Sequence, residues 1–122
     1  MGSLKIITYN VNGLHNPVKK KKILQQLKQL KCQVAFLQET HLSEMEHEKL
    51  KKTWADKAYY SSHVSGRRRG VAILIHRTVN FITTSTHRDT EGRYILANGV
   101  IDGVDASLLN VYAPNEDDSA FI

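Results

Sequence analysis

Three apolar runs in this chain each end in a short polar cluster, and this pattern constrains the fold more than any other feature. The clusters are TYNVNGL at Thr8 to Leu14, QETH at Gln38 to His41, and NVYAPN at Asn110 to Asn115. Oxygen and amide groups gathered at the ends of neighbouring strands can hold a hard cation and donate to a phosphate. The pattern therefore indicates metal-assisted phosphodiester chemistry on a sheet.

The first part of the chain predicts strand, helix and strand. An apolar run over residues 4–9 reads as a strand, and Asn16 with Pro17 forms a good helix start. Leucine and isoleucine recur at helical spacing until about Lys31. Val34 to Leu37 is continuously apolar, which is typical of a strand buried on both faces. This order predicts an α/β layer.

The remaining sequence predicts one more helix, five strands and no domain boundary. Ser43 and Glu46 form a capping-box pattern, so a helix is expected over residues 44–54. Asp102 and Gly103 give the clearest hairpin turn. No linker or repeat appears, so residues 1–122 are expected to form one unit. The expected strands are residues 59–63, 71–76, 79–84, 94–101 and 106–112.

Composition favours an anionic partner. The formal net charge is +5, which is typical of nucleic-acid binding but equally of a basic, solvated surface. A single cysteine, Cys32, leaves no internal disulfide framework, and there is neither a leader pattern nor a long apolar stretch. We therefore expect a nuclear or cytoplasmic protein that is not secreted and has no membrane partner.

The order and spacing of four motifs resemble a known family. QETHL, GVAILI at Gly70 to Ile75, RDTEGRY at Arg88 to Tyr94, and LNVYAPN resemble the endonuclease/exonuclease/phosphatase superfamily, in its apurinic-endonuclease and exonuclease III branch. The likeness is greatest to the N-terminal endonuclease of LINE-type non-LTR retrotransposons. It implies an α/β fold, a four-layer sandwich of the DNase I-like type, with two mixed sheets face to face, helices outside and the site at one rim. This chain would supply one sheet and part of that rim.

Glu39 is the first candidate for chemistry, because a carboxylate at the end of an apolar strand needs a compensating cation. The resemblance implies that Glu39 binds Mg²⁺, with Mn²⁺ as a possible substitute, and that Asn10 belongs to the same metal and phosphate network. A solvent-facing glutamate and a simple Asn-rich turn are the structural alternatives. Tyr112 and Asn115 are predicted to act on the phosphate, although Tyr112 could instead only close its strand.

DNA is the implied partner, and several polar and basic residues are candidate contacts. Arg93 could bind a phosphate or a buried carboxylate, and the sequence does not separate the two. Lys19 to Lys22 form a further basic tract that could be mere solvated surface. The predicted DNA contacts are Asn12, His41, Arg67, Arg68, Arg69 and Arg93.

Two motifs that follow in the family are absent from these 122 residues: an Asp-x-Asn strand end and a Ser-Asp-His segment. The chain thus resembles a domain truncated after Tyr-Ala-Pro-Asn. We expect a Mg²⁺-dependent DNA phosphodiester hydrolase with little activity in this form, and a homodimer or partner chain over an exposed sheet face. The alternatives are a non-catalytic DNA- or protein-binding remnant and an apurinic-site or exonuclease III repair enzyme.

Overall fold

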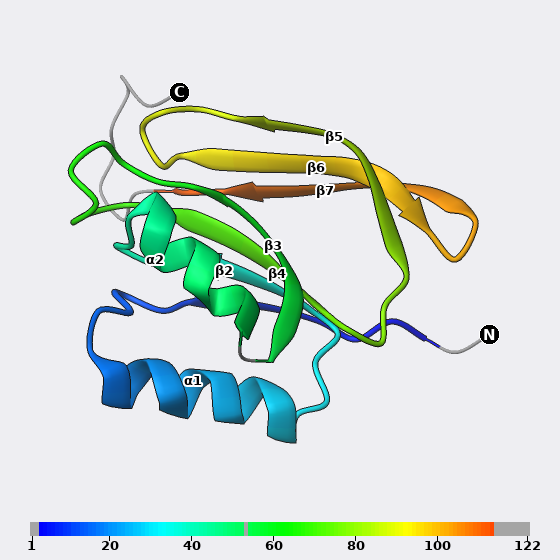
Figure 1. The fold of residues 1–122 in the computed structure, drawn as a ribbon, viewed down its shortest axis with the longest axis horizontal. Coiled ribbons are helices and arrows are strands. Elements are labelled where there is room, and N and C mark those ends of the chain that lie inside the picture. The colour runs from blue at the N-terminus through cyan, green and yellow to red at the C-terminus, as the bar shows by residue number, and fades with distance from the viewer. Residues whose placement is uncertain (1–2, 53, 114–122) are drawn as a thin grey trace.

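The computed structural model describes residues 3–52 and 54–113, which form three layers (Figure 1). Helices cover one face of a four-stranded sheet, and a three-stranded sheet packs on its other face. The helical layer contains α1 (Pro17–Gln29), α2 (Glu44–Glu48) and a 3₁₀ turn, η1 (Lys49–Lys52). No helix within the described residues is both long and apolar enough to cross a membrane.

The four-stranded sheet is mixed and has the order β1-β2-β4-β3. Its strands are β1 (Ile6–Asn10), β2 (Val34–Gln38), β3 (Ala55–Ser61) and β4 (Val71–His76). β1 and β2 are parallel, whereas β4 is antiparallel to both β2 and β3. In this register Asn10 lies opposite Gln38, and Gln38 lies opposite Val71. The polar clusters after β1 and β2 therefore meet at one rim.

The second sheet is an antiparallel meander of β5 (Phe81–Arg88), β6 (Tyr94–Ile101) and β7 (Val104–Val111). Asp102 and Gly103 form the predicted hairpin turn, with φ angles of 50° and 81°. The expectation that this chain supplies only one sheet is wrong. Tight turns pair these strands with one another, and their buried faces pack against the first sheet instead of extending it.

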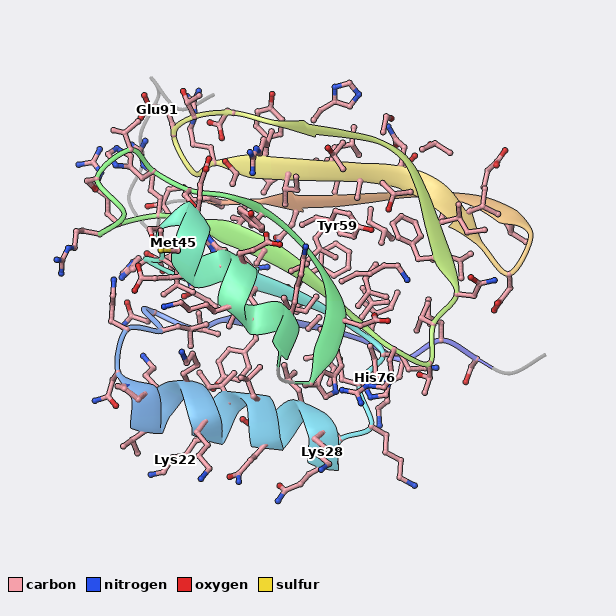
Figure 2. All side chains as sticks on the ribbon, viewed as in Figure 1. Lys22, Lys28, Met45, Tyr59, His76 and Glu91 are labelled. Atoms are coloured by element: carbon pink, nitrogen blue, oxygen red, sulfur yellow. The ribbon has the colours of Figure 1, made fainter. Side chains whose placement is uncertain are left out.

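Alternating side chains explain why the two central strands are apolar throughout. In β4, Val71, Ile73 and Ile75 belong to the core between the sheets, whereas Ala72 and Leu74 belong to the core under the helices. Every one of these residues is buried. Between the sheets, the labelled Tyr59 side chain meets Phe81 edge-on (Figure 2). β4 and β2 therefore occupy the middle of the molecule.

Several predicted boundaries are wrong. The helix expected over residues 44–54 ends as an α-helix at Glu48 and continues as η1, while β3 begins at Ala55 instead of Tyr59. A register shift between Ala55 and Lys57 hides the alternation that marks a strand. β5 also extends to Arg88, and β7 begins at Val104. The capping box of Ser43 and Glu46 is confirmed.

Asn110 joins the two sheets. Its side chain comes from β7 and is 3% exposed. Its amide nitrogen donates to the carbonyl oxygens of Leu37 and Ala72, both at 2.9 Å, and its oxygen accepts from the Gln38 amide at 2.9 Å. A buried amide that meets its partners fixes both position and orientation. The end of β7 is thereby attached to the ends of β2 and β4.

We expect Asn110→Ala to lower the free energy of unfolding by about 1–3 kcal/mol, because buried carbonyls and the Gln38 amide lose their partner. Chemical denaturation would measure this change. Asn98 offers a matched control on the same sheet, since its amide makes only exposed contacts with Ser85 and Ser107. Asn98→Ala should cost less than about 1 kcal/mol. Equal losses for the two variants would contradict the role given to Asn110.

Candidate active site

Loops from both sheets converge at the rim on the left of Figure 1 and are joined by backbone hydrogen bonds. The Gly13 amide donates to Glu39 at 2.7 Å, and the Thr40 amide donates to Gly70 at 3.1 Å. The Gly70 amide donates in turn to Gly92 at 3.1 Å, and the Tyr112 amide donates to Arg93 at 2.6 Å. The clusters that the sequence singled out are thus parts of one connected surface.

Residues in left-handed backbone conformations concentrate at this rim. Asn12, Glu39 and His41 have φ angles of 49°, 53° and 56°. Such angles are uncommon for residues other than glycine, and they cluster where structure serves a site. Gly70 allows the close packing, because a Cβ there would lie 2.5 Å from the Thr40 hydroxyl oxygen. The rim is therefore a strained arrangement that the surrounding contacts maintain.

Asn10 and Glu39 form the polar pair at the centre of the rim. The Asn10 amide nitrogen donates to Glu39 Oε2 at 2.6 Å. Asn10 Oδ1 accepts from the backbone N–H of Asn12 at 3.1 Å. A carboxylate only accepts and a backbone N–H only donates, so these two partners fix the orientation of the amide. Asn10 therefore orients Glu39, while Asn12 contributes its backbone.

His41 follows Thr40 in the same turn. Its Nδ1 would be 3.1 Å from a Cβ at Gly13, so the ring lies against that turn. Burial lowers the pKa of His41, the Glu39 carboxylate opposes that shift, and the charges of His15 and Lys19 add to it. The shift favours the uncharged imidazole. A DNA contact by His41 stays a prediction.

Arg69 and Tyr112 lie side by side at the rim. The Arg69 guanidinium is 5.9 Å from the centre of the Tyr112 ring, and its Nη1 lies 3.5 Å from Glu91 Oε2. Arg67 and Arg68 are exposed in the same loop. Glu91, labelled in Figure 2, lies at this same end of the molecule. The predicted basic tract therefore borders the candidate site.

The structure pairs Arg93 with a carboxylate: its Nε donates to Asp89 Oδ2 at 2.7 Å. Burial would raise the pKa of Asp89, but hydrogen bonds from Arg93 and Ser61 outweigh burial, and this pKa lies below its usual value. DNA binding by Arg93 stays a prediction.

The Lys19 ammonium donates to the Asn12 carbonyl oxygen at 2.9 Å, which brings the start of the lysine tract to the rim. Asn115 lies outside the described residues.

The donor set suits a hard cation that keeps much of its water. Glu39 offers a carboxylate at the rim, and the described residues contain no cluster of three or more acidic, histidine or cysteine side chains that could hold a metal. Mg²⁺ is commonly bound through one or two carboxylates with several waters. Asn10 Oδ1 already accepts from Asn12, so direct ligation by Asn10 stays a prediction.

Sequence reasoning assigned no individual role to three polar residues behind the rim, Gln38, Asn110 and His47. Gln38 donates to Thr8 and to Asn110, and so connects β1, β2 and β7. Asn110 is the polar residue within the apolar run Leu108 to Val111, and that interruption was a usable signal. His47 is fully buried, although it lies among charged residues of α2 that gave no hint of burial.

His47 lies directly behind the Glu39 turn. Its Nε2 is 2.7 Å from the Thr40 hydroxyl oxygen, and its Nδ1 is 2.9 Å from that of Ser62. The Tyr60 ring stacks on it at 5.0 Å. Burial lowers the pKa of His47 to about 4, which outweighs the opposing hydrogen bond at Ser43 and the charge of Glu46. The ring is therefore neutral in the folded protein.

The layers and the rim define an α/β sandwich of the DNase I-like type. The profile of the Endonuclease/Exonuclease/phosphatase family matches residues 7–120, and the chain belongs to this family. Its members are nucleases and phosphodiesterases that generally depend on a divalent metal. The predicted superfamily and fold class are confirmed.

Particular relatives agree with this assignment. Over 112 residues the chain is 30% identical to the "Transposon TX1 uncharacterized 149 kDa protein" of Xenopus laevis, covering 92% of this chain and 8% of that protein. Among solved structures, Caenorhabditis elegans TDP2 matches with a TM-score of 0.66 and 21% identity, over 93% of this chain and 36% of its own. A truncated form of the same protein gives 0.64, with 49% of its chain covered. The predicted relation to transposon proteins is confirmed.

The buried His47 predicts a specific pH dependence of stability. Its pKa is about 4 in the folded protein, against about 6.5 in an unfolded chain, so the unfolded chain binds the proton more tightly. The free energy of unfolding should therefore fall as the pH drops from about 6.5 to 4, by on the order of 3 kcal/mol. Denaturant titrations at each pH would measure this loss.

His47→Phe supplies the control for that titration, because it keeps a ring against Tyr60 and removes the titrating group. Its stability should change much less between pH 6.5 and 5 than that of the original chain. Glu46, Glu48 and Asp89 also have lowered pKa values, and their contribution is lost mainly below the usual carboxylate range. Identical pH profiles for the two proteins would contradict the prediction.

Proposed function

We propose that this chain carries the Glu39 half of a retrotransposon-type DNA endonuclease, in which a divalent cation, Mg²⁺ or Mn²⁺, assists hydrolysis of a phosphodiester. The observation that carries the proposal is the Asn10–Glu39 pair, 2.6 Å apart at the rim where both sheets end. The transposon relative favours this reading over a housekeeping apurinic or exonuclease III repair enzyme. Both the DNA substrate and the metal belong to the proposal.

Each rim residue has a role in this scheme. The cation held by Glu39 would neutralise charge on the phosphate. Asn10 keeps the carboxylate in place through its amide. The Arg69 guanidinium lies 5.9 Å from the centre of the Tyr112 ring. Both side chains would donate to the phosphate, and these hydrogen bonds would strengthen as negative charge develops on it. Arg67 and Arg68 lie where a DNA backbone crossing the rim would meet positive charge.

The groups that position and activate the attacking water are not among the motifs of this sequence. An Asp-x-Asn strand end and a Ser-Asp-His segment are both absent from the 122 residues. The chain also spans only 8% of the transposon relative and 36% of one solved structure. We therefore assign full hydrolytic activity to a protein in which this chain is joined by those groups.

Nicking of supercoiled plasmid with Mg²⁺ tests the proposal. A chain extended with the Asp-x-Asn and Ser-Asp-His segments of its own locus should nick, whereas the 122-residue chain should not. Glu39→Ala should reduce nicking by the extended chain by on the order of 10²-fold or more, because the cation loses its carboxylate. Glu44→Ala makes the same charge change at an exposed position and should leave the rate unchanged.

The outcomes separate the two parts of the proposal. Nicking that survives Glu39→Ala in the extended chain would show that the metal site is wrongly placed. Nicking by the 122-residue chain that is lost with Glu39→Ala would keep the metal site and refute the account of the missing groups.

A second candidate is a non-catalytic binding module, and one surface favours it. Ile82, Leu109 and Val111 are 59%, 54% and 46% exposed. Leu109 and Val111 alternate with buried Leu108 and Asn110, and Ile82 follows buried Phe81, so all three lie on the face of the second sheet turned away from the first. The face between the two sheets is covered by their packing, so this outer face is the one proposed for a partner. An apolar sheet face of this kind fits a second copy of the chain.

We expect the chain to associate with itself as its concentration rises, as followed by light scattering. The double variant Leu109→Glu with Val111→Glu should stay monomeric, because two charges would be buried in the contact. Val64→Glu, at an exposed apolar residue of the rim loop, is the control and should associate like the original chain. A monomer over a broad concentration range would exclude this second candidate.

A further inference from the structure

We propose that His47 is a positioning residue, which holds the Glu39 turn in its site geometry through a hydrogen bond with the Thr40 hydroxyl. The inference rests on the proposed function, because it assigns His47 to the carboxylate that would hold the cation. His47 contacts neither Asn10 nor Glu39 through any hydrogen bond of its own. Its effect is transmitted by the residue next to Glu39.

Thr40 is the fixed point of the turn. Its amide donates to the Gly70 carbonyl at 3.1 Å, and its carbonyl accepts from the Leu14 amide at 2.9 Å. Its hydroxyl meets His47 Nε2 at 2.7 Å. The residue is fully buried, and all its polar groups have partners. Of these three attachments, only the one to His47 is made by a side chain.

The imidazole is itself held from several directions. Its Nδ1 lies 2.9 Å from the Ser62 hydroxyl, and Tyr60 stacks on the ring with an angle of 12° between planes. Tyr60 is anchored in turn by donating to Glu48. A neutral imidazole donates from one nitrogen and accepts at the other, so Thr40 and Ser62 must play opposite roles. The ring cannot turn without breaking both bonds.

The turn needs such an attachment because its backbone is strained. Glu39 and His41, on either side of Thr40, both have left-handed φ angles. Each such residue costs about 1–2 kcal/mol, and the conformation persists only where neighbouring contacts enforce it. If Thr40 were released, relaxation of Glu39 would turn its carboxylate away from Asn10. The buried contact therefore maintains the exposed pair.

A merely structural histidine would behave differently from a positioning one. Loss of a purely structural core residue lowers global stability and leaves the geometry of the folded rim intact. Loss of the Thr40 bond should loosen residues 39–41 selectively while the rest of the fold stays ordered. Local measurements at these residues therefore distinguish the two roles.

The experiment compares five forms of the 122-residue chain by NMR: the original, His47→Phe, Thr40→Val, Thr40→Ser and Leu27→Ala. Thr40→Ser keeps the hydroxyl that Thr40→Val removes. Leu27 is a buried residue of α1 in the core under the helices, so Leu27→Ala controls for lost stability. Amide hydrogen exchange at Gly13, Thr40 and His41 reports on the turn. Paramagnetic broadening by Mn²⁺ at Asn10 and Glu39 reports on cation binding.

We expect His47→Phe and Thr40→Val to speed exchange at the turn by about tenfold relative to Ile73 in the central strand. Both should weaken Mn²⁺ binding by about tenfold, as loss of a group that orients a ligand commonly does. Thr40→Ser should stay close to the original chain in both measurements. Leu27→Ala should change exchange broadly and leave the Mn²⁺ affinity unchanged.

The inference is overturned if His47→Phe changes exchange at the turn no more than at Ile73, or if Thr40→Ser is as damaging as Thr40→Val. Should His47→Phe fail to fold, the Thr40 pair decides alone. Absence of Mn²⁺ broadening in the original chain would refute the proposed metal site, and the exchange rates would still decide the role of His47.

Discussion

The Asn110 side-chain amide is the interaction on which the relation between the two sheets depends. Hydrophobic packing brings the sheets together but is non-directional, whereas this buried amide satisfies the backbone of β2 and β4 at defined atoms. Its bond with Gln38 continues to Thr8 on β1. Tyr112 follows Asn110 by two residues, so the same contact determines where the third polar cluster lies. The site at the rim is therefore assembled by the packing of the two sheets.

The rim combines a rigid support with locally unfavourable backbone. Glu39 and His41 adopt left-handed conformations, and Gly70 and Gly92 let the loops approach more closely than any side chain would permit. Backbone hydrogen bonds across the loops and the buried Thr40–His47 contact hold this arrangement. Strain maintained by surrounding contacts is a common property of functional sites. Here the Glu39 carboxylate accepts a hydrogen bond from Asn10 within that turn.

Membership of the Endonuclease/Exonuclease/phosphatase family gives this geometry a chemical context. The parallel pairing of β1 and β2 puts Asn10 beside Glu39, and the second sheet adds Tyr112 and the loop of Arg93 to the same rim. Arg93 itself binds Asp89, which shows how an arginine near a site can serve its architecture. The outer face of the second sheet carries exposed apolar residues, so this face is suited to a further layer or a second chain.

The sequence by itself determined the elements whose signals are local. The apolar run Val34 to Leu37, the capping box at Ser43 and the Asp102–Gly103 turn each act over a few residues, and all were recognised. Tertiary structure alone decided that the last three strands form a separate sheet, that Arg93 pairs with Asp89, and that His47 is buried. The bonds of Asn110 join residues up to 73 positions apart, and no periodicity over a short window can encode such a partner. Local sequence determined which residues end each strand, and long-range packing brought these strand ends together at one rim.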